Sequence, residues 1–402
     1  MKKTLSLKCL LTLTLSFLLT ACGGGGGGGN DTSTFTSQGT VSVSLTDSPA
    51  CGFDEVNVTI TKVRVHQTGS ADENSGGWSD ITLAAPQKVN LLDLVNGNLL
   101  ALGSTTLVAG QYNQLRLVLQ PNTVASPLAN SVVPTGGVET ALTTPSGVQN
   151  GLKINEAFSI GANQTTALTL DFDACKSIVT SGAGNYLLKP VLSVIPMTGT
   201  GGITGLIDTA IMADKPVITA QLNGVVVKST VPNATTREFT LSPLGSSASK
   251  GNYDVVITAN GRVTAIITGV PVTAGTNAVV SNATTGGITL ASSTTNTVSG
   301  VVTPAATEAT IRAIQNLTPT GPAAVTVQST RNDLSTGAYS MTLPIEAPVL
   351  GAFGAGTLPI VFNQVLSAKG IYTIEGSATG FAAQSRSGVN INILGQTENF
   401  TF

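Results

Sequence analysis

The amino-acid sequence predicts an all-β protein built of tandem β-sandwich domains. From Thr40 onward apolar residues alternate with polar ones, a period of two that is typical of half-buried strands. The 45 glycines, together with many serines and threonines, favour short strands joined by turns. Aromatic residues make up only 4% of the 402 residues, so we expect cores of valine, isoleucine, leucine and alanine.

The charge of the chain argues against a nucleic-acid partner. Charged residues make up 10% of the sequence and the formal net charge is −2. Binding to phosphates needs clustered lysines and arginines, and a membrane-surface patch needs the same. The sequence therefore predicts no nucleic-acid binding. The mean hydropathy of +0.29 is high, but the apolar residues are spread in alternation, so we expect no membrane-spanning helix in the mature chain.

Residues 1–21 have the organisation of a bacterial lipoprotein signal peptide. Three lysines within the first eight residues precede a short apolar core, Cys9–Leu19, which is too short to span a membrane. The next residues, "LTAC", resemble the lipobox, in which leucine, two small residues and a cysteine mark the cleavage site. The resemblance implies that cleavage precedes Cys22 and that its sulfur and new amine are acylated, which anchors the chain in a membrane.

Residues 22–38 form a tether behind this anchor. Seven glycines, Gly23–Gly29, and a segment rich in serine and threonine have nothing to bury and predict a flexible linker. In lipoproteins an aspartate directly after the lipidated cysteine would resemble an inner-membrane retention signal, and this chain has Gly23 there. We therefore expect a lipid-anchored protein of the bacterial cell envelope, in the outer membrane where the cell has two membranes.

Two of the four cysteines are left for the folded part. Cys9 leaves with the signal peptide and Cys22 carries the lipid, so Cys51 and Cys175 stay in a compartment outside the cytoplasm. Two such cysteines most simply form one disulfide. A metal pair or a reactive thiol is the alternative, but His66 is the only histidine, which disfavours a Cys/His zinc site.

Residues 39–196 form the first predicted β-sandwich domain. Its second strand alternates through Val56–Ile60 and then changes phase at Val63, which is the sequence mark of a bulge or strong bend. Short helices are expected around Leu91–Asn96 and over Ala174–Val179. The domain ends near Pro196, before a glycine-rich linker.

Five motifs of this domain occur in a characteristic order. They are "GTVSVSLTDSPA", "VNLLDL", "AGQYNQLRLVL", "PSGVQNGLKI" and "LDFDACKSI". In this order they resemble a bacterial and archaeal lipoprotein domain, the domain-of-unknown-function family forty-three eighty-two. The resemblance covers most of the domain, and it implies a fold and an envelope location without an established chemistry.

The rest of the chain contains an internal repeat. "GNYDVVITANG" (Gly251–Gly261) and "GIYTIEGSATG" (Gly370–Gly380) share the pattern G-x-Y-x5-A-x-G, which predicts two copies of one β-sandwich, at 199–284 and 285–402. These modules resemble carboxypeptidase regulatory-like, transthyretin-type sandwiches, whose G-x-Y strand ends in A-x-G followed by tyrosine or phenylalanine. Phe381 fits that ending and Arg262 departs from it. The resemblance implies immunoglobulin-like or transthyretin-like accessory modules without catalytic residues.

Three carboxylates are candidate calcium ligands. Asp171 and Asp173 are two residues apart on one predicted strand, so both side chains lie on one face, about 6–7 Å apart. A Cys51–Cys175 bridge would bring Asp47 near them and create an oxygen-rich site for Ca²⁺. In the alternative interpretation Asp173 caps the helix that follows and Asp47 caps a turn. The sequence suggests no other cofactor.

No catalytic set is complete in the sequence. There is no G-x-S-x-G motif, and any triad would depend on His66 alone. We therefore expect a non-enzymatic binding or structural module, such as an adhesin-like or assembly protein, whose partner is an envelope protein or a glycan. One alternative is a lipoprotein that binds Ca²⁺, a glycan or a small ligand, and another is a hydrolase that uses Asp171 and Asp173.

Overall fold

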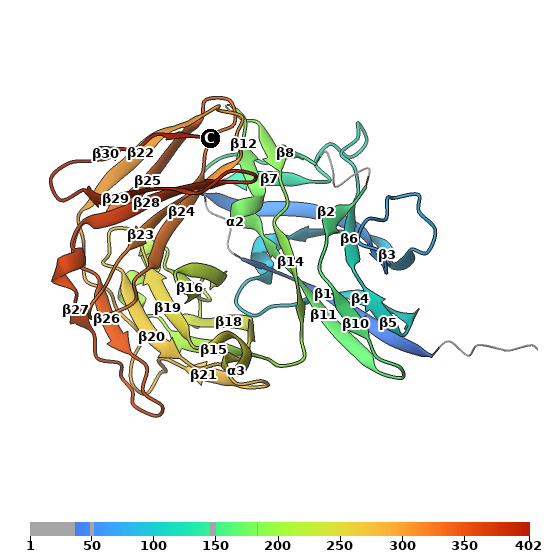
Figure 1. Cartoon of the computed structure of the whole chain (residues 1–402), viewed down its shortest axis with the longest axis horizontal. Coiled ribbons are helices and arrows are strands. Elements are labelled where there is room, and N and C mark those ends of the chain that lie inside the picture. Colours follow the sequence, from blue (N-terminus) through green and yellow to red (C-terminus); the bar gives the residue numbers. More distant parts are fainter. Residues whose placement is uncertain (1–36, 49–51, 145–149, 183) are drawn as a thin grey trace, which may run out of the picture. The chain divides into compact units, whose positions relative to one another are not determined.

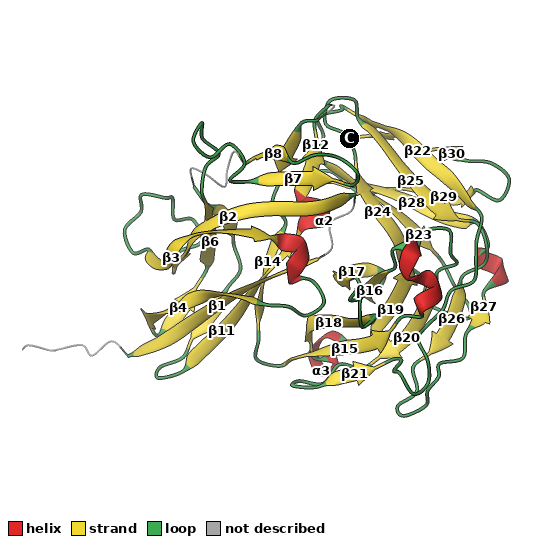
Figure 2. Ribbon diagram, turned by 180° about the vertical axis from the view of Figure 1, so that it is seen from behind, coloured by secondary structure: helices red, strands yellow, loops and turns green. Residues whose placement is uncertain are grey.

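Strands make up nearly all regular structure in the computed structural model, which describes residues 37–48, 52–144, 150–182 and 184–402 (Figure 2). The predicted all-β fold class is confirmed. Its seven sheets fall into three sets, and hydrophobic clusters drawn from residues 41–194, 203–290 and 298–400 form the three main cores. No helix among the described residues has the length and apolar character needed to cross a membrane.

The first domain contains three sheets (Figure 1). One has the order β14-β11-β1-β4, with β1 (Gln38–Ser48), β4 (Leu100–Val108), β11 (Thr165–Asp173) and β14 (Leu192–Pro196). The largest sheet has the strand order β12-β13-β8-β7-β2-β6-β9, and β3 also pairs with β2. Its strands are β2 (Phe53–His66), β3 (Ser79–Asn90), β6 (Gln114–Leu119), β7 (Ser131–Pro134), β8 (Thr140–Thr143), β9 (Leu152–Ile154), β12 (Ile178–Thr180) and β13 (Tyr186–Leu188). The third pairs β5 (Gly110–Tyr112) with β10 (Phe158–Ile160).

The alternation of β1 determines which face of its sheet is the core face. Val41, Val43 and Leu45 are buried in the first core, because period two places all three on one side. The phase change predicted in β2 is also confirmed. The register of β2 against both β3 and β6 shifts between Ile60 and Lys62, as a bulge requires.

Both short helices of the first domain occur where they were predicted, and both are shorter. The first is a 3₁₀ helix, η1 (Leu91–Leu94), whose preceding residue Asn90 accepts a hydrogen bond from the backbone of Leu92. The second, α2 (Ala174–Ser177), ends where β12 begins, because the β-branched pair after Ser177 continues as a strand.

The second domain has a three-stranded and a six-stranded sheet. The three-stranded sheet, β18-β15-β21, consists of β15 (Thr200–Leu206), β18 (Glu238–Gly245) and β21 (Asn277–Val279). The six-stranded sheet, β17-β16-β19-β20-β26-β27, consists of β16 (Val217–Leu222), β17 (Val225–Thr230), β19 (Tyr253–Thr258), β20 (Ala265–Val270), β26 (Val349–Ala352) and β27 (Asn363–Gln364). Two short helices, η2 (Thr209–Asp214) and α3 (Ser247–Lys250), connect strands.

The third domain is formed by two four-stranded sheets. In one, β22 (Thr295–Thr303) pairs with β25 (Ala338–Pro344), β30 (Gln396–Thr397) and β31 (Phe400–Thr401). The other has the order β24-β23-β28-β29, with β23 (Ala309–Gln315), β24 (Val325–Arg331), β28 (Ile371–Ala378) and β29 (Gln384–Asn390). A 3₁₀ turn, η3 (Leu366–Ala368), precedes β28.

The internal repeat corresponds to equivalent strands in the two later domains. Tyr253 begins β19 and Tyr372 lies near the start of β28, and each is fully buried inside its sheet. Each phenol donates a hydrogen bond to a backbone carbonyl, Tyr253 to Gly245 at 2.8 Å and Tyr372 to Pro344 at 2.7 Å. The two tyrosines therefore have the same packing role in both copies of the repeat.

The sheet of the second domain crosses the sequence boundary expected at residues 284 and 285. β26 lies parallel to β20, with Ala265 opposite Val349, and β27 extends the sheet further (Figure 1). A small additional hydrophobic cluster joins residues of both domains, among them Ile266 and Leu317. A segment that lies between β25 and β28 of the third domain thus completes the sheet of the second domain, which links the last two domains.

Candidate functional site

The most buried ion pair among the described residues joins the first and second domains. The ammonium of Lys228, on β17, lies 2.5 Å from Oδ1 of Asp171, on β11, and the two side chains are 2% and 9% exposed. Lys228 also donates a hydrogen bond to the backbone carbonyl of Asp47 at 3.2 Å. Burial raises the pKa of Asp171 above its ordinary value, although the nearby ammonium opposes this rise.

The strand register explains how Asp171 reaches Lys228. Asp171 lies opposite Thr46 of β1 and Ser193 of β14, so these side chains share the face of the sheet that points away from the core residues Leu170 and Phe172. A charged residue on this face would usually be solvated. Here the second domain covers it and supplies the opposite charge.

Asp47 occupies the neighbouring position on β1 and is completely buried. Its Oδ1 accepts a hydrogen bond from the backbone of Ala174 at 3.0 Å, which supports the start of α2. Its Oδ2 has no hydrogen-bond partner within the described residues. Burial raises the pKa of Asp47 well above its usual range, and the hydrogen bond from Ala174 opposes that effect only in part.

Asp173 is the N-cap of α2, as one of the two sequence interpretations predicted. Its Oδ1 accepts a hydrogen bond from the backbone of Lys176 at 3.0 Å, and its Oδ2 lies 2.6 Å from the ammonium of the same lysine. Asp173 therefore satisfies a free amide of the helix start and pairs with a cation one turn later.

The three aspartates are neighbours, as predicted, but their contacts do not favour calcium. Asp171 and Asp173 each face a lysine, and Asp47 faces a backbone amide. Among the described residues no group of three or more His, Cys, Asp and Glu side chains is placed so that it could hold a metal ion. The structural interpretation of these carboxylates accounts for their contacts, and a calcium site at Asp47, Asp171 and Asp173 stays a prediction.

Three predicted site features involve residues outside the described part of the chain. Cys22, with the signal peptide and the tether up to residue 36, precedes the first described residue, Ser37, and β1 begins at Gln38. Cys51 also lies outside the described residues, whereas Cys175 is in α2. The lipid anchor and the Cys51–Cys175 disulfide therefore stay predictions.

A second set of bonds joins the first and second domains beside the ion pair. The backbone amide of Asn96 donates to Thr230 Oγ1 at 2.9 Å. The side chain of Asn96 accepts from the backbone of Thr240 and donates to the carbonyl of Glu238. Asn96 has a positive φ of 63°, which an asparagine tolerates better than most residues and which directs its side chain toward the second domain.

The first and third domains are joined around α2 and β12. Arg331 of β24 donates to the carbonyl of Lys176 at 2.5 Å, and its guanidinium lies 3.6 Å from Glu308. Asp333 accepts a hydrogen bond from the backbone of Gly182 at 3.0 Å. The backbone of Leu334 adds a further hydrogen bond, to the carbonyl of Thr180, at 2.9 Å. These bonds use backbone groups of the first domain, so they depend on its fold and not only on its surface charges.

One side chain joins the second and third domains by hydrogen bonds to both backbone groups of a single residue, as a neighbouring strand would make. Gln221 of β16 donates to the carbonyl of Thr326 at 2.7 Å and accepts from the amide of the same residue at 2.9 Å. Arg312 also donates to the carbonyl of Gly224. Each of the three domains is therefore bonded to both of the others.

A cavity of about 300 Å³ lies between the first and third domains. Phe53 and Tyr186 line it and contact each other edge to face, with their ring centroids 5.6 Å apart. Arg331 and Ser329 line it from β24. Nε of Arg331 is buried without a hydrogen-bond partner in the described structure. We refer to this space as the interface cavity.

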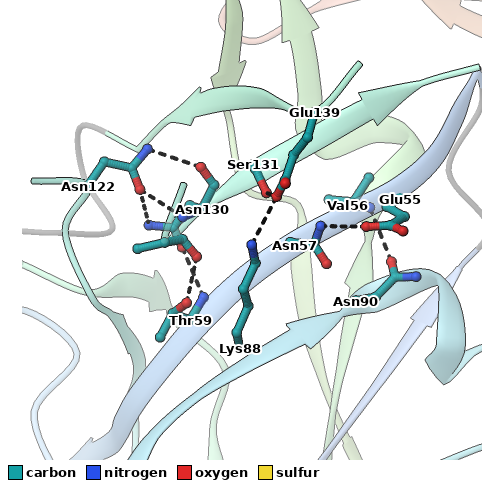
Figure 3. A network of polar contacts seen from close by, with 11 residues as sticks. Glu55, Val56, Asn57, Thr59, Lys88, Asn90, Asn122, Asn130, Ser131 and Glu139 are labelled. Atoms are coloured by element: carbon teal, nitrogen blue, oxygen red, sulfur yellow. Dashed lines mark hydrogen bonds and ion pairs between the residues drawn. The ribbon is translucent and has the colours of Figure 1, made fainter. Parts of the chain in front are cut away.

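A network of polar side chains lies along β2 and joins segments of the first domain by hydrogen bonds and an ion pair (Figure 3). Asn130 is fully buried. Its side-chain oxygen accepts from the backbone of Thr59 at 3.0 Å, and its backbone N–H donates to Oδ1 of Asn122 at 2.7 Å. Glu139 accepts from Ser131 and pairs with Lys88 at 2.9 Å. These side chains bond one another, so the network stabilises the sheet.

The only histidine is engaged in a structural contact. Nδ1 of His66 accepts from the backbone of Thr68 at 2.8 Å, and Nε2 lies 2.8 Å from the carbonyl of Gly76. Its ring lies 5.0 Å from that of Trp78, which also contacts the guanidinium of Arg64. His66 therefore holds a loop against the sheet.

The sequence interpretation missed Lys228 and the other residues that join the domains. In "VVVKST", Lys228 lies two residues before the buried Thr230 on the same strand, which is a weak sign that the lysine is buried. Gln221 and Asn96 carry no comparable signal, because each contacts a residue more than one hundred positions away.

The comparison with protein families supports the first domain. Residues 38–190 match the family described as "Domain of unknown function (DUF4382)", which is less than half of the chain. This agrees with the resemblance stated for the first domain. The sequence matches no curated protein.

Several solved structures are similar to this chain at low identity. They include the Bacillus anthracis TIE protein (12% identity, 91% of this chain, 50% of that chain, TM-score 0.16). A single B repeat unit of the collagen-binding surface protein of Staphylococcus aureus has 15% identity over 50% of this chain and 100% of its own, with a TM-score of 0.16. The streptococcal ancillary pilin has 7% identity over 90% of this chain and 98% of its own, also at 0.16. The chain thus spans half the length of the TIE protein, and TM-scores this low support no argument about function.

Proposed function

We propose that the chain is a lipid-anchored, non-enzymatic structural and binding protein of the bacterial cell envelope. In this proposal the three domains form one rigid body, which the glycine-rich tether holds away from the outer membrane. The observation that carries the proposal is that each domain is bonded to both others through buried side chains, a shared sheet and backbone hydrogen bonds.

The contacts of the ionisable residues support a role without catalysis. The carboxylates of Asp171 and Asp173, which the hydrolase alternative needs, each pair with a lysine. His66 uses both ring nitrogens in backbone contacts. Each of these groups is held by a partner inside the fold, which supports a structural role.

The lipid anchor rests on the sequence around Cys22 and has a direct test. Cells grown with labelled palmitate should label the chain, and Cys22→Ala should abolish the label and release the protein from the membrane fraction. A matched Cys9→Ala variant should leave both unchanged, because Cys9 lies in the part that is removed. Equal labelling of the Cys22→Ala variant would refute the anchor.

A second candidate function is small-ligand binding in the interface cavity. Its aromatic edge from Phe53 and Tyr186 and its polar side from Ser329 and Arg331 resemble the mixed lining of ligand sites. The test is the melting temperature of the chain with a panel of monosaccharides and with Ca²⁺. A rise that Phe53→Ala removes would support binding there, and no shift with any probe would exclude these ligands.

A further inference from the structure

Lys228 and Asp171 are close enough to react with each other. Nζ lies 2.5 Å from Oδ1. Because Oδ1 is bonded to Cγ at about 1.23 Å, Nζ can be no further than about 3.7 Å from that carbon. Reacting atoms held about 3–3.5 Å apart are in the range of a near-attack geometry. The amine and the carboxyl carbon therefore need only a small movement to meet.

The hydrogen bonds of Lys228 fit an amide better than an ammonium. An ammonium has three N–H donors, and within the described residues Nζ has two acceptors, Asp171 Oδ1 and the carbonyl of Asp47. An amide formed with Asp171 would carry a single N–H. The carbonyl of Asp47, 3.2 Å from Nζ, is an acceptor for that one donor.

Burial favours the neutral form of the Asp171 carboxyl, which the reaction requires. Both side chains are almost closed to water, where separated charges are costly. The pKa of Asp171 is raised by burial, and a proton passed from Nζ to Oδ1 would leave a free amine beside a carboxylic acid. Exclusion of water also opposes the reverse reaction, which is hydrolysis.

We propose that Lys228 and Asp171 condense to an amide that links β17 to β11 covalently. The ammonium first transfers a proton to the carboxylate. The free amine then attacks Cγ, the new C–N bond forms, and the C–OH bond breaks. The leaving hydroxyl takes the second proton of the amine and departs as one water molecule. Atoms and charges balance, and no oxidant, cofactor or nucleotide is needed.

The amide would fix the contact between two domains in a way that an ion pair cannot. Lys228 and Asp171 are 57 positions apart, so the bond closes a loop that includes the linker between the domains. Such a bond resists unfolding and pulling, because the chain between the two residues can no longer be extended. This modification does not depend on the lipid anchor, so its test is independent of the test of the proposed function.

Mass spectrometry of the purified full chain tests the amide directly. After reduction and alkylation, a tryptic digest should contain a peptide in which Lys228 is uncleaved and joined to Asp171, lighter by one water than the sum of its parts. Tandem fragmentation should locate the bond at these two residues. Lys228→Arg should remove the loss of water, because a guanidinium does not condense with a carboxylate under these conditions.

The exposed pair Lys369 and Glu346 provides the matched control. These groups are 2.8 Å apart but are 44% and 42% exposed, so water competes and no bond is expected. Loss of water confined to Lys228 and Asp171 would establish the proposal. Complete cleavage at Lys228, with both peptides at their full mass, would overturn it, and this outcome needs no variant to fold.

Discussion

Lys228 and Asp171 come from different domains and meet at 2.5 Å in a site that is almost closed to water. Neither residue could be buried alone, because an unpaired charge in such a site is strongly unfavourable. The pair therefore makes the burial of each side chain depend on the docking of the two domains. The free energy of unfolding should reflect this dependence.

Replacing Lys228 with methionine should destabilise the chain strongly. The variant keeps the length of the side chain and leaves Asp171 buried without its partner, which costs about 3–5 kcal/mol. Chemical denaturation of the wild type and the variant measures the difference. Lys369→Met removes an exposed pair and should cost less than about 1 kcal/mol. Equal losses in the two variants would show that Lys228 is not a docking residue.

Asp47 should make stability depend on pH in a definite direction. Burial raises the pKa of its carboxyl in the folded state, so the folded chain binds a proton more tightly than the unfolded chain. The contribution of Asp47 to the free energy of unfolding is fully present below the ordinary aspartate pKa of about 3.9. It is lost as the pH rises through the pKa that Asp47 has in the folded state.

Asp47→Asn removes this titration and can keep the acceptor for Ala174. The difference in unfolding free energy between wild type and variant should therefore shift in favour of the variant as the pH rises above about 4. Denaturation curves at several pH values measure it. A difference that stays constant with pH would mean that folding does not raise the pKa of the Asp47 carboxyl.

Gln221 should contribute more to the free energy of unfolding than an exposed glutamine does. Its side chain hydrogen-bonds both backbone groups of Thr326 across two domains. Gln221→Ala leaves a buried amide and a buried carbonyl unsatisfied, which costs about 1–3 kcal/mol. Gln364→Ala, at an exposed position in β27, is the matched control and should cost less than about 0.5 kcal/mol. If both variants unfold at the same denaturant concentration, the contact contributes nothing.

The two cysteines of the folded part should give no free thiol. A thiol reagent added under denaturing, non-reducing conditions should not label Cys51 or Cys175, and reduction should expose both. In the chain-entropy account a bridge over such a long loop stabilises by about 5 kcal/mol. Reaction of either cysteine without reductant would exclude the disulfide.

The alternation of apolar residues was sufficient to predict the strands and their buried faces. Val41, Val43 and Leu45 are buried as expected, and the phase change in β2 marks a real shift in register. The N-cap role of Asp173 could also be predicted, since capping depends on the next three residues only. These features are local, and local chemistry determines them.

The contacts between domains could not be predicted in the same way. Lys228 and Gln221 look like ordinary strand residues, and their partners lie 57 and 105 positions away. The shared sheet of β20 and β26 depends on a parallel pairing across the predicted boundary at residue 284. Sequence periodicity shows which face of a strand is covered, but it carries no information about which distant segment covers it.

Calorimetry of the Cys22→Ala chain tests most directly whether the three domains form one rigid body. If each domain depends on its contacts with both others, heating should give a single transition whose calorimetric and van't Hoff enthalpies agree. Lys228→Met should then lower the temperature of that whole transition. Two or three separate transitions, with Lys228→Met shifting only one of them, would contradict the account.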